Sequence, residues 1–306
     1  MLKDAVPAAR RRKFLRSLAA AALLPVAAMA GGSPLIVRRV PATGEILPPI
    51  GLGTWQSFDV SGQEDLAAAK ETLRLFAGQG GSVVDSSPMY GKSEAVIGRL
   101  AAATGLTGKL FLATKVWTEG REAGIRQMEE SFKRMGTRRM DLMQIHNLVD
   151  AATHAKTLRE WKEAARIRYW GITHYHSGAY ADIERLIKAE KPDFLQINYS
   201  LAEPQSAARL LPLARDLGLA VIANRPFAEG ELFARVKGKT LPAWAADFDA
   251  ASWAQFFLKW ILAEPAVTCA IPGTRNPKYL MDNMAAGRGR LPDEPTRARM
   301  VALLRG

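Results

Sequence analysis

Residues 82–94 read Ser-Val-Val-Asp-Ser-Ser-Pro-Met-Tyr-Gly-Lys-Ser-Glu, and the fold can be worked out from this stretch. It begins with a short, mostly apolar run of the kind found in buried strands, and the run ends at an acidic residue, Asp85. The stretch therefore predicts a buried strand that ends in a polar residue and leads into a polar loop.

The same unit recurs along the chain. Short apolar runs suited to buried strands occur near residues 50–53, 82–85, 109–115, 141–146, 168–172, 194–198, 219–223 and 267–270. Between them lie segments with apolar residues three and four apart, as on one face of a helix, such as 66–76, 125–135, 183–187 and 253–262. Eight alternating strands and helices over roughly 250 residues are the dimensions of a closed (β/α)₈ TIM barrel, an α/β fold.

Two further segments bear on the fold. Residues 36–40 and 45–47, separated by a short Pro- and Gly-containing turn, predict a β-hairpin before the barrel. Residues 224–250 contain Pro and Gly and no sustained periodicity, which predicts a long loop on the upper face of the barrel, in the position of a substrate lid.

A doubly wound open sheet is the alternative arrangement of alternating strands and helices. That fold usually carries a Gly-x-Gly-x-x-Gly turn after its first strand. Here Gly51 and Gly53 are followed by Thr54, Trp55 and Gln56, so the fingerprint fails and the barrel is favoured.

The charge of the chain is uneven. Of the formal net charge of +12, the first 30 residues contribute +5, from six Lys and Arg less Asp4, and the remaining charges are scattered among carboxylates. Without aromatic residues interleaved in one basic stripe, this pattern favours a solvated surface over nucleic-acid binding. Cys269 is the only cysteine, so no intramolecular disulfide can form, and its apolar neighbours predict a buried thiol.

The N-terminus has the order of an export signal. Residues 10–15 read Arg-Arg-Arg-Lys-Phe-Leu, an apolar stretch follows at 18–30, and it ends in Ala28-Met29-Ala30. The stretch is shorter than the ~20 residues of a membrane span, and the paired arginines resemble a twin-arginine (Tat) signal. We expect residues 1–30 to be a signal peptide read by the Tat export machinery and residues 31–306 to be a periplasmic barrel domain with no membrane span after cleavage. An uncleaved anchor or a cytosolic basic tail is the alternative.

Four polar residues interrupt the apolar runs at their carboxyl ends, where barrel active sites form: Asp85, Lys115, His146 and Gln196. Any one of them alone could be a paired structural residue. Ionisable groups that are desolvated together are costly unless they serve each other, so four on one rim indicate an active site.

The loop after the second strand places Tyr90 above Asp85. A lysine ammonium near a phenol lowers the tyrosine pKa from about 10, and a carboxylate keeps the lysine charged. Such a tyrosine can donate a proton to a developing alkoxide while a histidine orients the carbonyl oxygen. No side chain can supply a hydride, so a redox step here requires a cofactor.

These motifs together resemble the aldo/keto reductase superfamily. The resemblance rests on residues 51–55 (Gly-Leu-Gly-Thr-Trp), on the Asp-x4-Tyr-Gly-x-Ser-Glu pattern of 85–94, on Lys115 and on 144–146 (Gln-Ile-His), and it spans about residues 35–286. It implies an NADPH-dependent reductase of a small aldehyde or ketone, with NADH a poorer cofactor. It also implies that Tyr90 is the proton donor, and that the residues supporting it are Asp85, Lys115 and His146.

The resemblance further implies which residues contact the cofactor. Around the nicotinamide and the first strands these are Thr54, Trp55, Asp85, Thr173, His174 and Gln196. Near the end of the chain, residues 271–278 open the last helix, whose start suits a phosphate, and an arginine suits a second one. There Thr274 and Arg275 would face the 2′-phosphate and Asn283 the adenine.

The chain departs from the family pattern after the seventh strand. Many relatives have a tyrosine there that stacks on the nicotinamide, whereas this chain has Asn224 followed by Arg225. We expect Arg225 to contact the cofactor, either over the ring or at a phosphate. His174 and His176 have a spacing that can bind a metal, but no third ligand is in view and no metal is expected; His154 is expected on the surface of the fourth helix.

Two other functions remain as alternatives to the reductase. The altered residue at 224 leaves open an NADP-binding sensor or regulatory subunit with little turnover. A metal-dependent barrel hydrolase needs clustered His, Asp and Glu ligands at several strand ends, and this sequence offers one histidine and one carboxylate there. The substrate itself, which Trp55, Trp117 and residues 224–250 would select, cannot be read from the sequence.

Overall fold

The computed structural model describes residues 33–305. The predicted signal peptide, residues 1–30, lies outside the described residues and stays a prediction.

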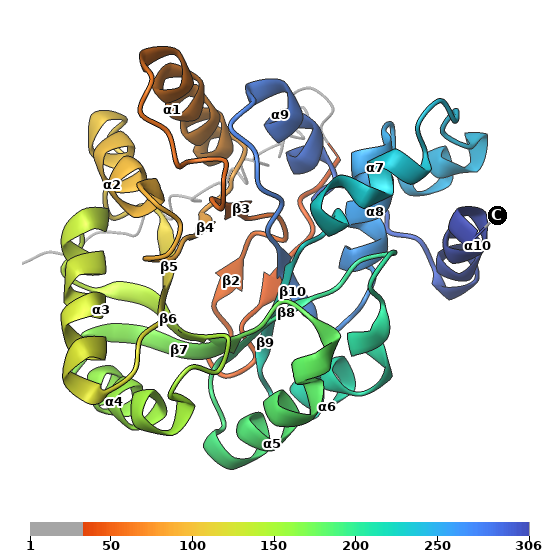
Figure 1. Ribbon diagram of the computed structural model, residues 1–306. Coiled ribbons are helices and arrows are strands. Elements are labelled where there is room, and N and C mark those ends of the chain that lie inside the picture. Colours follow the sequence, from red (N-terminus) through yellow and green to blue (C-terminus); the bar gives the residue numbers. More distant parts are fainter. Residues whose placement is uncertain (1–32, 306) are drawn as a thin grey trace, which may run out of the picture. The chain divides into compact units, whose positions relative to one another are not determined.

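Eight parallel strands form the centre of this part, and strands that follow one another in the sequence lie side by side (Figure 1). They are β3 (Leu52–Gly53), β4 (Val83–Asp85), β5 (Phe111–Val116), β6 (Met140–His146), β7 (Ile167–Thr173), β8 (Phe194–Asn198), β9 (Ala220–Asn224) and β10 (Val267–Ala270). The first and last strands are joined by backbone hydrogen bonds from Gly51 N to Ala270 O (2.8 Å) and from Ala270 N to Pro49 O (2.9 Å). The sheet therefore closes into the predicted barrel, and the eight predicted strands are confirmed.

Glycines allow this closure. A Cβ on Gly51 would lie 2.9 Å from Val83 O, and one on Gly53 would lie 2.8 Å from Ile271 O. Real Cβ atoms do not come this close to backbone oxygen, so the junction of β3 with its neighbours requires residues without side chains. Barrel closure therefore explains Gly51 and Gly53, which do not form the dinucleotide-binding motif.

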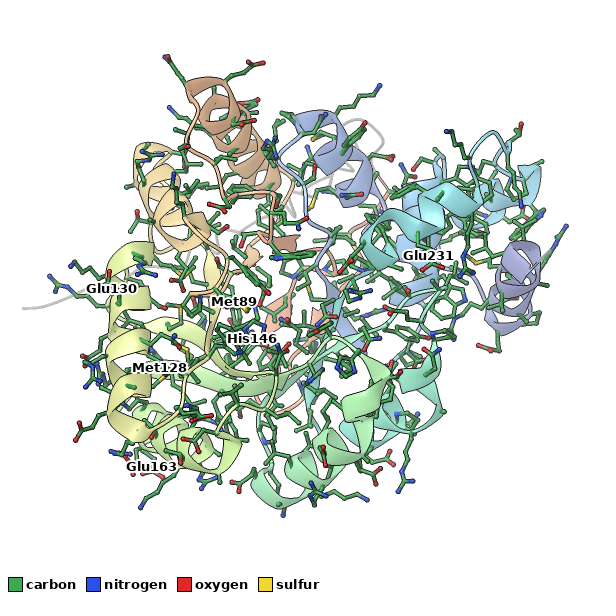
Figure 2. The ribbon with its side chains drawn as sticks, viewed as in Figure 1. Met89, Met128, Glu130, His146, Glu163 and Glu231 are labelled. Atoms are coloured by element: carbon green, nitrogen blue, oxygen red, sulfur yellow. The ribbon has the colours of Figure 1, made fainter. Side chains whose placement is uncertain are left out.

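Helices surround the strands (Figure 1). They are α1 (Gln63–Gly78), α2 (Ser93–Ala103), α3 (Arg121–Met135), α4 (Ala151–Glu163), α5 (Tyr180–Glu190), α6 (Leu210–Asp216), α8 (Trp253–Leu262), α9 (Pro277–Ala285) and α10 (Glu294–Arg305). The four predicted helical segments fall within α1, α3, α5 and α8. On α3, for example, Met128, Phe132 and Met135 are buried on one face, and Met128 is labelled in Figure 2. Within residues 33–305, the helices fall short of the length and apolarity that crossing a membrane would need.

The predicted hairpin is confirmed as an antiparallel pair of β1 (Arg38–Arg39) and β2 (Ile46–Leu47). Val40 and Leu47, at its ends, pack with the side chains that fill the barrel interior. Cys269 belongs to the same interior cluster and is fully buried, as predicted. The hairpin and this cluster fill the barrel away from the carboxyl ends of the strands, where the polar residues lie.

The structure corrects the prediction of one long loop at residues 224–250. The segment contains the short helices η3 (Ala228–Gly230), α7 (Glu231–Arg235) and η4 (Ala243–Phe248). Leu232 and Phe248 are buried in the core, so the segment is packed against the barrel rather than lying free over it. These helices are too short to show a sustained apolar period, so the sequence pattern predicts a loop there.

The predicted surface position of His154 is wrong. Its side chain is fully buried between α4 and α3, and its Nε2 lies 2.7 Å from Thr118 O. Gly124 of α3 provides the space, because a Cβ there would lie 2.4 Å from the imidazole Cε1. Burial of His154 depends on a neighbouring helix that local sequence does not reveal.

Candidate active site

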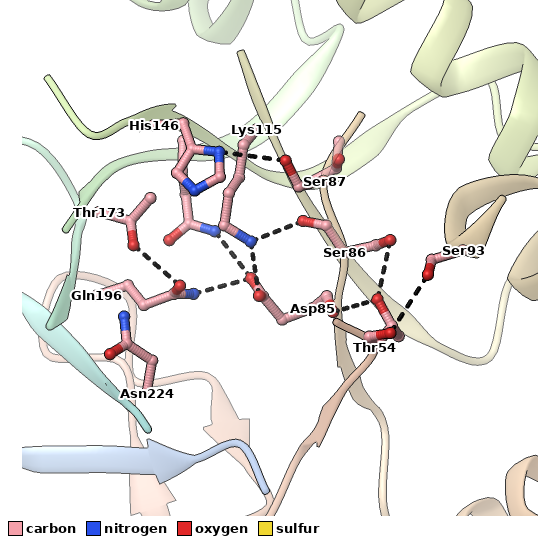
Figure 3. Close-up of polar contacts among 12 residues, drawn as sticks. Thr54, Asp85, Ser86, Ser87, Ser93, Lys115, His146, Thr173, Gln196 and Asn224 are labelled. Atoms are coloured by element: carbon pink, nitrogen blue, oxygen red, sulfur yellow. Dashed lines mark hydrogen bonds and ion pairs between the residues drawn. The ribbon is translucent and has the colours of Figure 1, made fainter. Parts of the chain in front are cut away.

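A buried ion pair lies at the carboxyl ends of β4 and β5. Lys115 Nζ donates to Asp85 Oδ2 (2.6 Å) and to Ser86 O (2.7 Å), and both charged side chains are buried (Figure 3). Asp85 is the register partner of Ala113, so Lys115 lies two residues further along β5 and its side chain faces the same way, into the barrel. The pairing offsets the cost of removing both charges from water.

Two amides complete the surroundings of this pair. Asp85 Oδ1 accepts hydrogen bonds from Gln196 Nε2 (2.8 Å) and Gln144 Nε2 (3.1 Å), and Thr173 Oγ1 donates to Gln196 Oε1 (2.9 Å). Both carboxylate oxygens are therefore partnered. Sequence reasoning assigned no role to Gln144, although it precedes His146 by two residues on β6 and so faces the same side of the strand.

Tyr90 joins the group from the loop after β4. Lys115 Nζ lies 4.9 Å from the centre of its ring, and the ring meets that of His146 edge to face at 6.0 Å between centroids. His146 and Met89, the residue before Tyr90, are labelled in Figure 2. The structure thus brings together all four residues expected to carry the chemistry.

Burial and neighbouring charges together determine the pKa values of Lys115 and Tyr90. Burial alone would lower the pKa of the Lys115 ammonium, but Asp85 and the phenol oxygen of Tyr90 outweigh it and raise that pKa. For Tyr90, burial raises the phenol pKa and outweighs the opposing effect of Lys115. The expected lowering of the Tyr90 pKa is therefore wrong, because desolvation of the phenolate dominates over the nearby positive charge. The phenol is protonated at neutral pH.

His146 is neutral at the same pH. Its pKa is lowered to about 3, first by burial, then by the positive charge of Lys115, and then by electrostatic coupling to His174. Its Nδ1 lies 3.2 Å from Ser87 Oγ (Figure 3), and when that hydroxyl donates to Nδ1, the ring proton lies on Nε2. A neutral imidazole held this way can donate one hydrogen bond to a substrate oxygen.

Several residues expected to contact the cofactor gather at a separate cavity of about 570 Å³. It is lined by Trp55, Gln56, Ser57, Ala68, Gly273, Thr274, Arg275, Asn276, Pro277 and Tyr279. Asn276 caps α9 by accepting a hydrogen bond from Lys278 N (2.9 Å), and Asn283 is buried further along that helix. The segment predicted to hold the adenosine phosphate therefore lines a cavity.

The expected cofactor residues Arg275 and Thr54 are held within the protein in different ways. The Arg275 guanidinium donates from Nε to Asp65 Oδ1 of α1 (2.9 Å), with both side chains about half exposed. The Thr54 hydroxyl is buried and donates to Asp85 O (3.0 Å). The half-exposed Arg275 guanidinium can exchange Asp65 for another partner. The buried Thr54 hydroxyl instead holds the start of the loop after β4.

His174 follows β7 on the same rim. Its Nδ1 accepts a hydrogen bond from Tyr175 N (2.9 Å), and its pKa is lowered to about 4 by burial and by His176. Asn224, at the end of β9, donates from Nδ2 to His174 O (2.9 Å). His174 is therefore neutral, and its ring proton lies on Nε2.

Arg225 lies at the mouth beside two carboxylates. Its Nε donates to Glu203 Oε2 (3.2 Å), its Nη1 pairs with Glu229, and its guanidinium carbon lies 6.0 Å from the centre of the Tyr175 ring. Its backbone φ of +50° is in the left-handed region, which non-glycine residues rarely adopt. The loop thus holds Arg225 over the rim of the barrel.

His174 and His176 have a spacing that could bind a metal ion. Among residues 33–305, no group of three or more His, Cys, Asp or Glu side chains is arranged to hold a metal ion. The Nδ1 atoms of both histidines accept backbone N–H groups, of Tyr175 and of Gly178 respectively.

Comparisons with known proteins agree with the fold. The model of the aldo/keto reductase family matches residues 49–298. An aldo-keto reductase of Strobilurus tenacellus is 29% identical over 258 residues, covering 70% of this chain and 74% of that protein. A methylglyoxal reductase of Escherichia coli is 27% identical, covering 81% and 88%. A crystal structure of a Klebsiella pneumoniae aldo-keto reductase in complex with NADPH has the same fold, with a TM-score of 0.74 at 24% identity over 89% of this chain and 95% of that one. This chain belongs to the aldo/keto reductase family of oxidoreductases.

Proposed function

We propose that the protein reduces an aldehyde or ketone to an alcohol with NADPH, and that Tyr90 is the proton donor. The observation that carries this proposal is the Tyr90 ring, whose centre lies 4.9 Å from Nζ of the buried Lys115–Asp85 pair and which lies edge to face with His146. Asp85, Lys115 and His146 support the tyrosine.

NADPH supplies the hydride, which no side chain can provide. The cavity between the loop after β3 and the start of α9 suits the adenosine end, with Thr274 and Arg275 at the 2′-phosphate and Asn283 at the adenine. Trp55 lines the same cavity, and the rim residues Thr173, His174, Gln196 and Arg225 would hold the nicotinamide and pyrophosphate. The NADPH complex of the similar Klebsiella protein supports this choice of cofactor.

The protein's own part is to bind the carbonyl group and to deliver a proton. Tyr90 would donate its hydroxyl proton to the carbonyl oxygen, while bound NADPH would supply the hydride to the carbonyl carbon, so that the products would be the alcohol and NADP⁺. The phenolate left behind is stabilised by the Lys115 ammonium, which Asp85 keeps charged, until solvent reprotonates it. His146 donates to the same carbonyl oxygen and orients it.

The first test is direct. The purified protein is mixed with NADPH and a panel of aldehydes and ketones, and cofactor absorbance is followed. We expect carbonyl-dependent oxidation of NADPH with a matching amount of alcohol. NADPH binding without turnover on any member of the panel would favour the alternative, an NADP-binding sensor or regulatory subunit.

We also propose that residues 1–30 are a Tat signal and that residues 31–306 form the exported, periplasmic domain. The support is the order of Arg11-Arg12, Phe14-Leu15, the apolar stretch and the Ala-x-Ala ending. A domain that binds NADPH must meet the cofactor before it leaves the cytoplasm, and the Tat machinery carries folded proteins.

A further inference from the structure

Ser87, in the loop after β4, contacts His146 and has no role in the mechanism proposed above. Its side chain is fully buried, and its Oγ lies 3.2 Å from His146 Nδ1 (Figure 3). It belongs to the same short segment as Asp85 and Tyr90. A buried hydroxyl therefore links the loop of the proposed proton donor to the histidine that lies beside it.

The hydrogen bonds around Ser87 indicate where its hydroxyl proton points. Its Oγ accepts a hydrogen bond from Met89 N (3.4 Å). Within residues 33–305, His146 Nδ1 is the only acceptor to which this hydroxyl is hydrogen bonded. If Nδ1 itself carried a proton, the proton of the buried hydroxyl would have no acceptor, which is unfavourable. The hydroxyl therefore donates to Nδ1.

This direction determines which nitrogen of His146 carries the ring proton. The imidazole is neutral, since its pKa is lowered to about 3, and a neutral imidazole has one N–H group. With Nδ1 as the acceptor, that group is at Nε2, which has no bond to the residues drawn in Figure 3. In the other tautomer, Nε2 would present a lone pair and would repel a carbonyl oxygen that the N–H attracts.

We propose that Ser87 is a positioning residue whose hydroxyl selects the tautomer of His146 that can donate from Nε2 to the substrate carbonyl oxygen. This inference rests on the proposed function, which supplies the carbonyl group. The same residue also holds the turn before Tyr90, because its backbone oxygen accepts from Tyr90 N (3.0 Å). Ser87 thus joins the two side chains that meet at the carbonyl oxygen in the proposed mechanism.

The test reads the tautomer directly. The protein is labelled with ¹⁵N-histidine, and long-range ¹H–¹⁵N NMR spectra are recorded at neutral pH without substrate or cofactor. The protonated and the bare nitrogen of a neutral imidazole differ widely in ¹⁵N shift. The chain has four histidines, so the spectrum is simple, and the variant His146→Gln identifies the signals of His146. Wild type, Ser87→Ala and Ser87→Thr are compared.

In the wild type we expect one tautomer of His146, with the proton on Nε2 and a bare Nδ1. Ser87→Ala should populate the form protonated at Nδ1, and Ser87→Thr, which keeps a hydroxyl, should restore the wild-type spectrum. In Ser87→Ala, kcat/KM for carbonyl reduction should fall about tenfold, the size of one neutral hydrogen bond, while NADPH affinity stays unchanged.

Two results would overturn the proposal: a proton on Nδ1 in the wild type, or an unchanged tautomer in Ser87→Ala. If Ser87→Ala does not fold, the wild-type spectrum alone decides. Absence of turnover by the wild type on every carbonyl compound would instead overturn the proposed function. The spectra need no turnover, so the two failures can be told apart.

Ser206→Ala is the matched control. Ser206 is also a fully buried serine, but its Oγ donates to Asn198 O (3.1 Å) instead of to a histidine. This variant loses a buried hydroxyl with a hydrogen bond of similar length, and it should keep the wild-type tautomer and kcat/KM. An equal fall in kcat/KM in both alanine variants would mean a general effect of losing a buried hydroxyl and would refute the specific role of Ser87.

Discussion

At Tyr90, two effects act on one phenol in opposite directions. Burial raises its pKa and the Lys115 charge lowers it, and burial is the larger. The proton that the proposed reaction takes from Tyr90 is therefore present at neutral pH. Tyr90→Phe should lower turnover by about 10²- to 10⁴-fold, the usual contribution of general acid catalysis. NADPH affinity should stay nearly unchanged, because the proposed role of the hydroxyl is at the substrate oxygen. Steady-state rates and fluorescence titration check both, and wild-type turnover in the Phe variant would rule out Tyr90 as donor.

The same pKa determines how reduction depends on pH. In the proposed mechanism the active form has a protonated Tyr90 phenol, so a raised pKa extends activity to higher pH. The fall in kcat/KM should therefore come only above the ordinary phenol pKa of 10. The His146 pKa of about 3 puts the titration of that ring below the working range. We expect kcat/KM for reduction to be flat from about pH 6 to about pH 9. A loss of activity with an apparent pKa near neutrality would contradict this assignment.

Arg275 offers a test of cofactor choice. Its guanidinium pairs with Asp65 at the surface and is available to a phosphate. Arg275→Ala should weaken NADPH binding by about 1.5 to 3 kcal/mol, the worth of a charge-assisted hydrogen bond, and should change NADH binding little. Arg74→Ala is the control, since Arg74 is an exposed arginine on α1 that pairs with Glu71. Equal losses for both cofactors in Arg275→Ala would show that this residue does not read the 2′-phosphate.

Helices α2 and α3 approach each other closely at Gly98. A Cβ on Gly98 of α2 would lie 2.1 Å from Arg134 O, a backbone atom that cannot move aside without shifting α3. Gly98→Ala should therefore lower the free energy of unfolding by about 1 to 3 kcal/mol. Gly78, in the last turn of α1, has nothing within 4 Å of a Cβ, and Gly78→Ala should be neutral or stabilise by up to about 1 kcal/mol. Chemical denaturation of both variants measures the difference, and equal stabilities would show that α2 and α3 can separate freely.

For the whole molecule, the export proposal joins the barrel to its N-terminal segment. A chain that binds NADPH in the cytoplasm and crosses folded needs no oxidative step on the far side, and Cys269 is its only cysteine. Replacing Arg11 and Arg12 by Lys should leave a folded, active precursor in the cytoplasm. Cell fractionation and the mass of the N-terminus measure this. Wild-type protein found in the cytoplasm with residues 1–30 intact, or normal export of the double-Lys variant, would contradict the proposal.

Much of the barrel could be predicted because its determinants are local. A buried strand has to be a short apolar run, and a polar residue at its carboxyl end stands out against that run, as Asp85, Lys115 and His146 do. Since strand ends meet on one rim in a parallel barrel, the order of these residues already predicts that they meet. The short helices of residues 224–250 escaped prediction because each is too brief to show a period.

What the sequence determined by itself was therefore the kind of fold, the rim on which the polar strand-end residues meet and the residues that we propose as catalytic. Only the tertiary structure decided the quantities that depend on surroundings from several strands and helices at once. The Tyr90 pKa rises because desolvation outweighs a nearby charge, and His154 is buried because Gly124 on another helix makes room for it. The contact of Ser87 with His146 is of the same kind. Burial and hydrogen-bond partners arise from residues far apart in the chain, and no local pattern of residue types records them.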